Sequence, residues 1–142
     1  MDMLEEVIYH LSKNIKTELK NSNIDGIGVF AIRDINEGEQ VFPLWQQNGG
    51  WYILPEDKLD SIPNDVMRLI DKYFITVDSK FKMIKLFKGM NFVFDSLSFC
   101  NSAWPNRENI NISTKGVALR DIKAGEEILE WYTENIDLAN SK

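Results

Sequence analysis

The chain of 142 residues has only one cysteine, Cys100, and only one histidine, His10. A single cysteine excludes an intrachain disulfide framework and a cysteine-cluster zinc site, so we expect a reducing compartment and no bound metal. No segment has the apolar length that crosses a membrane, and the acidic N-terminus does not resemble a signal peptide. These absences predict a cytoplasmic protein without membrane contact, or one of the host cell interior if the source is viral.

Positive charge is also scarce, because 16 Lys and Arg face 22 Asp and Glu and give a formal net charge of -6. This balance argues against direct nucleic-acid binding, since the phosphate backbone favours clustered Lys and Arg. It would attract a protein partner whose lysines lie in a basic segment, although the same balance also serves simple solubility. The length and the 44% hydrophobic content predict one domain over residues 1–142.

A nine-residue phrase occurs twice, as residues 31–39 and again as residues 118–126. The copies share six identical positions and one Ile/Leu exchange. Each copy has alternating apolar residues, then a glycine suited to a turn, then further strand residues. The repeat therefore predicts one hairpin design that is used twice, as a scaffold without chemistry of its own.

The remaining pattern is mainly β with some α. Apolar residues at helical spacing predict a helix over residues 3–11, and His10 on this helix is expected at the surface. Alternating or strand-like residues predict strands at 15–19, 41–45, 81–87 and 91–94. A helical insert is expected at about residues 55–74.

Three short segments combine residue types that suit ligand contact. Residues 23–31 place two glycines where a backbone can pass close to a ligand. Residues 99–106 form a polar, small-residue loop, and residues 125–132 form an alternating strand that ends in a tyrosine. Taken singly, each segment is more simply a turn, an Asx-rich loop or a packed aromatic residue.

In this order the three segments resemble the SET domain, the fold of most protein lysine methyltransferases, over about residues 15–132. Residues 26–35 resemble the family phrase G-x-G-v-f-A-x-r-d-I, residues 100–106 its N-H-S-x-x-P-N loop, and residues 125–132 its G-E-E-L-x-x-D-Y ending. The resemblance implies a β-clip fold of small curved sheets. It also implies a C-terminal segment threaded beneath the polar loop as a pseudoknot.

The resemblance implies an S-adenosylmethionine-dependent enzyme that transfers methyl groups to a lysine side chain of a protein substrate. The cofactor and the lysine would enter from opposite faces and meet in a narrow channel, where Tyr132 takes the position of the catalytic tyrosine. The residues implied to bind the cofactor are Gly26, Ile27, Gly28, Cys100, Asn101 and Trp104. Transfer requires an aligned, neutral amine, which the Tyr132 hydroxyl would orient.

The sequence departs from the family pattern at two places. Aligned without a gap, Cys100 and Asn101 stand where the family has Asn-His; if one residue is deleted, Asn101 keeps the family's Asn and the His is lost. In either case the loop has no histidine, and Glu130 and Trp131 precede Tyr132 in place of an aromatic residue and Asp. The number of methyl groups added is therefore open. Two alternatives exist: a catalytically impaired SET-like protein-binding module, and a β-clip domain with unrelated small-molecule chemistry.

The channel for the substrate lysine needs more residues than the resemblance supplies, because only ten residues come after the proposed catalytic tyrosine. Three groups could complete it. These are residues 133–142, a second subunit in a homodimer, or the substrate itself.

Overall fold

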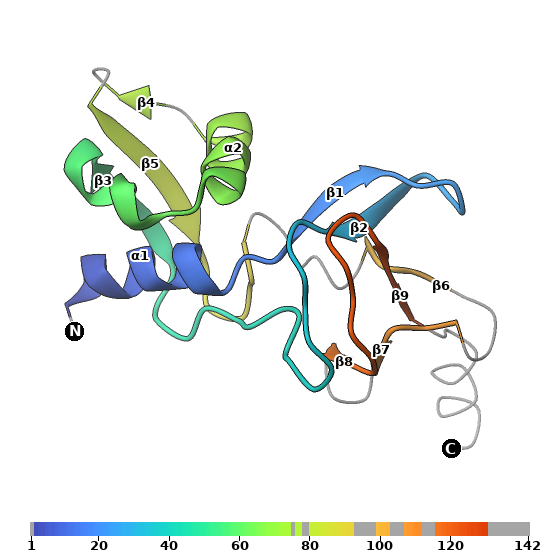
Figure 1. Ribbon diagram of the computed structural model, residues 1–142. Helices are drawn as coiled ribbons and strands as arrows, with labels where there is room; N and C mark the ends of the chain where they lie inside the picture. Colours follow the sequence, from blue (N-terminus) through green and yellow to red (C-terminus); the bar gives the residue numbers. More distant parts are fainter. Residues whose placement is uncertain are drawn as a thin grey trace, which may run out of the picture. The chain divides into compact units, whose positions relative to one another are not determined.

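The computed structural model describes residues 2–74, 76–77, 80–92, 99–102, 107–111 and 116–130. The chain divides into two units, and each unit joins two separate segments. The first unit comprises Met1–Ile15 and Pro43–Asp95, and the second comprises Lys16–Phe42 and Ser96–Lys142. Short strands in small sheets predominate, with some helices, which confirms the predicted class, mainly β with some α (Figure 1). The threading of the C-terminal segment as a pseudoknot stays a prediction.

The first unit begins with helix α1 (Met3–Lys13), which confirms the helix predicted from the apolar spacing. Asp2 caps the helix, because its side chain accepts a hydrogen bond from Glu5 N at 2.8 Å. Val7 and Leu11 are fully buried on one face of the helix. No helix within the described ranges is long and apolar enough to cross a membrane.

The sheet of the first unit contains β3 (Gly50–Pro55), β5 (Phe81–Leu86) and β4 (Thr76–Val77) in that order, all antiparallel. The helical insert between β3 and β4 is confirmed. It consists of a 3-10 helix, η1 (Glu56–Ser61), and an α-helix, α2 (Asn64–Tyr73).

The predicted strand at residues 41–45 is wrong, because these residues form bends and loop. Of the strand predicted at 91–94, Asn91 and Phe92 lie in a bend, and the rest lies outside the described residues. Pro43 has no N–H to donate to a sheet, and its carbonyl accepts instead from Asn91 Nδ2 at 2.6 Å. Trp45 N bonds to Met90 O, outside any strand. The segment is therefore held by single contacts and not by a ladder.

His10 is buried, with 2% of its surface exposed, so its predicted surface position is wrong. Its Nε2 donates to Asn91 O, and its Nδ1 accepts from Asn14 Nδ2 at 3.0 Å. Its ring packs edge-on against Trp45 with 5.4 Å between centroids. Burial lowers the pKa of His10, so the neutral ring serves as a structural group with both nitrogens satisfied.

The main sheet of the second unit contains β1 (Thr17–Asn21), β2 (Ile27–Ala31), β9 (Glu127–Glu130) and β6 (Asn101–Ser102) in that order. Figure 1 shows β9, in red, between β2 and β6. Strand β6 runs parallel to β9, whereas the other pairs are antiparallel. A second pair joins β7 (Ile110–Asn111) to β8 (Val117–Ala118).

The two copies of the repeat, Ala31–Glu39 and Ala118–Glu126, pair with each other. Ile35 N donates to Ile122 O, and Ile122 N donates to Ile35 O, each at 2.7 Å. Both isoleucine side chains are fully buried in the core of this unit. The prediction of a separate hairpin in each copy is therefore wrong, because pairing across the copies buries both isoleucines at one point.

The hydrogen bonds between the copies are reciprocal: each bond from the first copy has a counterpart from the corresponding residue of the second. At 2.8–2.9 Å, these bonds run from Gly38 N to Ala118 O, Gly125 N to Ala31 O, Ala31 N to Glu126 O and Ala118 N to Glu39 O. The ladder continues outward, since Phe30 pairs with Glu127 and Gln40 bridges to Val117. The repeat thus holds the end of β2 beside the start of β9.

Candidate functional site

The three segments singled out in the sequence meet at the Glu127 side chain. Asn101 Nδ2 donates to Glu127 Oε2 at 2.8 Å, and Ser22 Oγ donates to Glu127 Oε1 at 2.8 Å. Gly28 faces the same carboxylate, so a Cβ at Gly28 would come within 3.0 Å of Asn101 Nδ2 and closer still to Glu127. A Cβ at Gly28 would therefore displace the Glu127 carboxylate, which glycine leaves free to bond to Asn101 and Ser22.

The turn before β2 is tied to the same group of residues. Gly26 has a φ of +43°, and its carbonyl accepts from Ser22 N at 2.8 Å. The carbonyl of Asp25 accepts from Asn101 Nδ2 at 3.1 Å. The turn is thus bound to β6, although the two segments lie far apart in the sequence.

Ile27 and Cys100, both predicted to contact the cofactor, have opposite exposures. The Ile27 side chain is 51% exposed at the start of β2. The Cys100 side chain is fully buried in the core of the second unit. Only the backbone of Cys100 is therefore suited to a ligand contact, whereas Ile27 offers an apolar side chain to solvent.

Asn101 has both N–H groups of its amide engaged, one with the Asp25 carbonyl and one with Glu127. Its Oδ1 is the polar atom of the side chain that is left for a ligand, and an amide oxygen can only accept. At this position the chain therefore offers an acceptor to a donor group of a bound molecule.

Sequence reasoning missed Asn109, which is fully buried and holds β9 in place. Its Nδ2 donates to Glu127 O at 2.8 Å, and its Oδ1 accepts from Leu129 N at 2.7 Å. Asn109 N also donates to Leu129 O at 3.0 Å. Its position a few residues after the polar loop was the available signal, but the partners became visible only in the fold.

Glu130 ends β9 with only 7% of its surface exposed, and it pairs with Ser102 of β6. Its Oε2 has no hydrogen-bond partner among the described residues. Burial raises the pKa of Glu130 to about 7. A carboxyl group that is half protonated near neutral pH therefore lies two residues before Tyr132.

Trp104 and Tyr132 lie outside the described residues, so their predicted roles stay predictions. The predicted contacts of Gly26, Ile27, Gly28, Cys100 and Asn101 with a cofactor also stay predictions, although the structure brings the two turns together at Glu127. Within the described ranges, no group of three or more His, Cys, Asp or Glu residues is placed to hold a metal ion.

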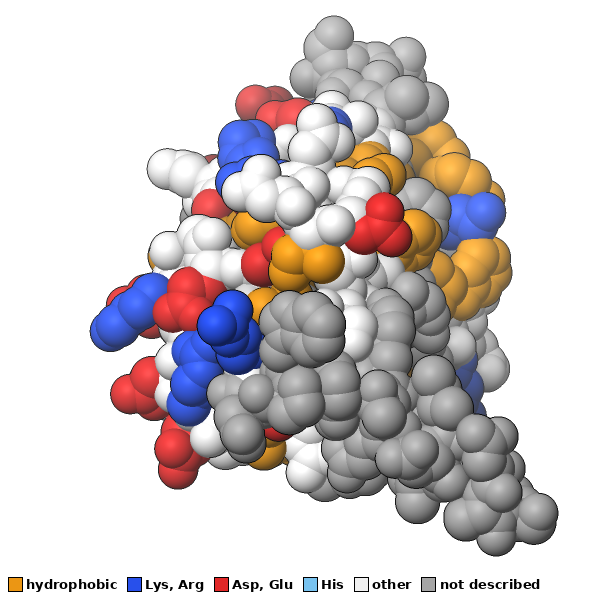
Figure 2. All heavy atoms as spheres, turned by 90° about the vertical axis from the view of Figure 1, so that its right-hand side faces the viewer, with side chains coloured by type: hydrophobic (Ala, Val, Ile, Leu, Met, Phe, Trp, Pro, Cys, Tyr) orange, Lys and Arg blue, Asp and Glu red, His pale blue; other side chains and the backbone are white. Residues whose placement is uncertain are grey.

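Charges of both signs lie side by side around the repeat. Lys16 Nζ pairs with Glu39 at 3.0 Å, and Arg120 pairs with Glu126 at 3.1 Å. Figure 2 shows Lys, Arg, Asp and Glu side chains intermixed on the described part of one face. This mixture does not resemble the clustered positive charge that a nucleic-acid surface needs.

The sequence of residues 26–133 matches the model of the SET domain family, and this match covers most of the chain. The chain therefore belongs to the SET domain family. The match includes Gly28, Asn101 and Glu127, the residues at which the three segments meet. No curated protein sequence matches the chain significantly.

Two solved structures are similar to this chain. One is a provisionally assigned histone methyltransferase of Plasmodium falciparum, 18% identical, with a TM-score of 0.37, and the match covers 84% of this chain and 94% of that one. The other is the CpSET8 protein of Cryptosporidium, 21% identical, with a TM-score of 0.38, and here the match covers 83% and 58%. Because both TM-scores are low, the family membership rests on the sequence match.

Proposed function

We propose that the chain is an S-adenosylmethionine-dependent protein lysine N-methyltransferase. The observation that carries this proposal is the meeting of the Gly28 turn, the Asn101 loop and β9 at Glu127, within a chain of the SET domain family. These are the three segments whose sequences match the family motifs. Their convergence argues that the altered loop keeps its place beside β9.

The described residues fit part of the proposed cofactor. When bound, S-adenosylmethionine supplies a methyl group on a positively charged sulfur. The molecule also carries amino groups, which are donors, and Asn101 Oδ1 is an acceptor beside the Gly26 turn, with no partner among the described residues. The exposed Ile27 side chain adds apolar surface at the same turn. Gly28 lies against the Glu127 carboxylate, which occupies the space that a side chain at this position would need.

Methyl transfer needs a neutral lysine amine in line with the methyl group. A desolvated channel lowers the pKa of a lysine, so no strong base is required. We assign the orientation of the amine to the Tyr132 hydroxyl, on the family motif alone. The bound cofactor would supply the methyl group to the lone pair of the lysine nitrogen, and its sulfur would keep the electron pair of the broken carbon–sulfur bond, while the amine would lose one proton to solvent.

The proposed substrate is a protein with an accessible lysine in a basic segment. The formal net charge of -6 supports this choice, because a negative chain attracts positively charged segments over long distances.

The direct test incubates the protein with labelled cofactor and a set of lysine-rich proteins, and measures label on lysine. Tyr132→Phe should lower the rate by about 10²-fold or more, because the hydroxyl that orients the amine is lost. Calorimetry should show unchanged cofactor binding for this variant. Tyr73→Phe is the matched control, since Tyr73 ends α2 in the first unit, and the rate of methyl transfer by this variant should not change.

A second candidate function is a SET-like module that binds a protein without catalysis. It is favoured by the altered loop, in which the Cys100 side chain is in the core and both donors of Asn101 bond within the chain. This candidate predicts no heat of cofactor binding and no transfer to any lysine. It also predicts that Tyr132→Phe leaves partner binding intact.

A further inference from the structure

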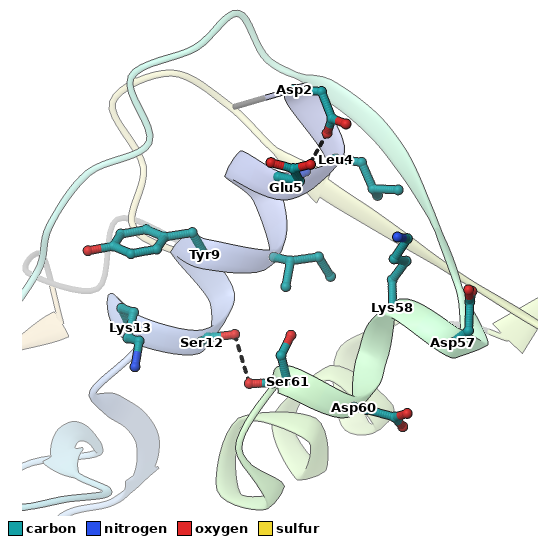
Figure 3. A pocket seen from close by; sticks show the side chains of 11 residues that line it. Asp2, Leu4, Glu5, Tyr9, Ser12, Lys13, Asp57, Lys58, Asp60 and Ser61 are labelled. Carbon is teal, nitrogen blue, oxygen red and sulfur yellow. Dashed lines mark hydrogen bonds between the residues drawn. The ribbon is translucent and has the colours of Figure 1, made fainter.

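A hollow of about 600 Å³ lies in the first unit between α1 and η1, and none of the residues that line it belongs to a family motif (Figure 3). We call it the α1–η1 groove. Ser12 Oγ donates to Ser61 O at 3.1 Å and joins the two helices beside it. Because this bond ties α1 to η1, the groove is a formed feature of the unit.

The lining of the groove includes apolar side chains of α1 that the core does not use. Leu4 and Ile8 are only partly buried, and Tyr9 is 54% exposed. Leu4 and Ile8 lie four residues apart, on one face of the helix. Covering these side chains would remove apolar surface from water, which favours an occupant with apolar groups of its own.

Acidic side chains outnumber basic ones around the groove. The four acids are Asp2, Glu5, Asp57 and Asp60, and the two bases are Lys13 and Lys58. None of these six forms an ion pair with another residue in the part of the chain that the structure describes.

A second hollow of about 470 Å³ adjoins η1 and shares Asp57 and Asp60 with the groove. Three acids, Glu56, Asp57 and Asp60, and one base, Lys80, line this second hollow. The excess of negative charge therefore extends across η1, and it favours a positively charged occupant.

We infer that the α1–η1 groove docks a segment of a partner protein that carries both apolar side chains and net positive charge. Its apolar side chains would cover Leu4, Ile8 and Tyr9, and its cations would lie near Asp57 and Asp60. An amphipathic helix in a groove is a common mode of this kind. The inference goes beyond the proposed methyl transfer and does not depend on it.

The test measures binding of a labelled peptide of leucine and arginine, spaced as an amphipathic helix, to the full chain by fluorescence anisotropy. Arginine replaces lysine in this probe, so that it cannot accept a methyl group at lysine. The peptide with glutamate in place of arginine, and the peptide with serine in place of leucine, are the comparison probes. We expect both to bind at least about tenfold more weakly than the arginine–leucine probe.

Variants that remove single charges show whether peptide binding depends on the groove or on the rest of the surface. Asp57→Asn with Asp60→Asn should weaken binding about tenfold, whereas Lys58→Gln should strengthen it severalfold, because it removes a competing cation. Glu37→Gln in the second unit is the matched control and should leave affinity unchanged. Thermal unfolding of each variant checks that the fold is retained.

The proposal is overturned if the glutamate peptide binds as tightly as the arginine peptide, or if the Asp57/Asp60 variant folds normally and keeps its affinity. It is also overturned if Ile53→Lys, on the exposed face of β3, abolishes binding while the groove variants do not. Loss of methyl transfer in Tyr132→Phe with unchanged peptide affinity would separate this site from the proposed catalytic one.

Discussion

In the first copy of the repeat, Asp34 accepts a hydrogen bond from Ala124 N at 2.9 Å. In the second copy, Asp121 accepts the matching bond from Glu37 N at 2.8 Å. The donors, Glu37 and Ala124, are different residues at corresponding positions, but only their backbone is used. The accepting residue, Asp, is therefore the same in both copies, because its side chain forms the bond to the other copy. The donating residue differs, because only its backbone N–H forms the bond.

The glutamates that end the two copies follow the same rule: the accepting side chain is the same in both copies, whereas the residue that supplies the backbone N–H differs. Glu39 Oε1 accepts from Asn36 N at 3.1 Å, and Glu126 Oε1 accepts from Lys123 N at 3.0 Å. Burial raises the pKa of each glutamate, but hydrogen bonds and nearby cations outweigh it, so both pKa values are lowered. The cation differs, because Lys16 pairs with Glu39 whereas Arg120 pairs with Glu126.

The copies differ most in the residues that come directly after them. After the first copy come Val41 and Phe42, which are buried in the core of the second unit. After the second copy comes β9, which carries Glu127 and the buried Glu130. The same scaffold thus supports packing after one copy and the candidate site after the other.

The largest expected effect comes from breaking the pair at the centre of the repeat. Ile35→Ala and Ile122→Ala should each lower the free energy of unfolding by about 3 kcal/mol, because each leaves a cavity in a fully buried position. Leu119→Ala, at a position that is 43% exposed, is the control and should cost far less. Urea unfolding measures all three. If Ile35→Ala cost less than a third of Ile122→Ala, the copies would not be equivalent.

The pH dependence of stability should separate β9 from the glutamates of the repeat. The folded pKa of Glu130, about 7, lies above its ordinary value of 4.5. The stabilisation that the protonated Glu130 side chain gives to the folded state is complete below pH 4.5, and it is lost as the pH rises through 7. The loss should be on the order of 2 kcal/mol by pH 8.

Glu130→Gln should remove the loss of stability between pH 5 and pH 8, because glutamine does not ionise. Urea unfolding at the two pH values measures this loss. For Glu39 and Glu126 the sign is opposite, because a lowered folded pKa gives stability that is lost as the pH falls below 4.5. If the free energy of unfolding of the Glu130→Gln variant fell as steeply with pH as that of the parent, the raised pKa of Glu130 would not be the cause.

The turn glycines should respond alike in the two copies. Gly38 and Gly125 have φ values of +85° and +91°, and neither has a neighbour within 4 Å of an added Cβ. Gly38→Ala and Gly125→Ala should therefore each cost about 1 to 2 kcal/mol through backbone strain alone. Gly50→Ala is the control, since it has equal space and no positive φ. Thermal unfolding gives the comparison, and unequal costs would show that only one turn is constrained.

The smallest effect should come from the aspartates that join the copies. Asp34→Ala and Asp121→Ala should each cost about 1 kcal/mol, because each leaves one backbone N–H without its acceptor. Glu37→Ala makes the first copy more like the second and should change stability little. Hydrogen exchange at Ala124 N and Glu37 N tests the two bonds separately. Unchanged protection of these amides in the aspartate variants would show that the aspartates are not their acceptors.

Much of the fold could be predicted from local pattern. The spacing of Val7 and Leu11 indicated α1, and Pro63 marked the point where α2 begins in the insert. The family motifs indicated the SET domain and singled out Gly28 and Asn101 before their contacts were known. In each case the signal lay within a few consecutive residues.

Other features could not be predicted from local pattern. His10 lies three residues after Val7 on the buried face of α1, but Asn91, which bonds to its ring, and Trp45, which packs against it, lie far away in the sequence. Asn109 carries no motif, although it holds β9 at two backbone groups. Such partners come from distant parts of the chain, so no short window of sequence contains them.

The sequence by itself determined the helices, the turn glycines and the family, because spacing, capping and motif residues act over a few positions. It also showed that one phrase is used twice. Only the tertiary structure decided that the copies pair with each other and that Glu127 fills the space beside Gly28. The physical reason is that burial of Ile35 and Ile122 at one point and the satisfaction of each backbone group depend on which distant segments meet.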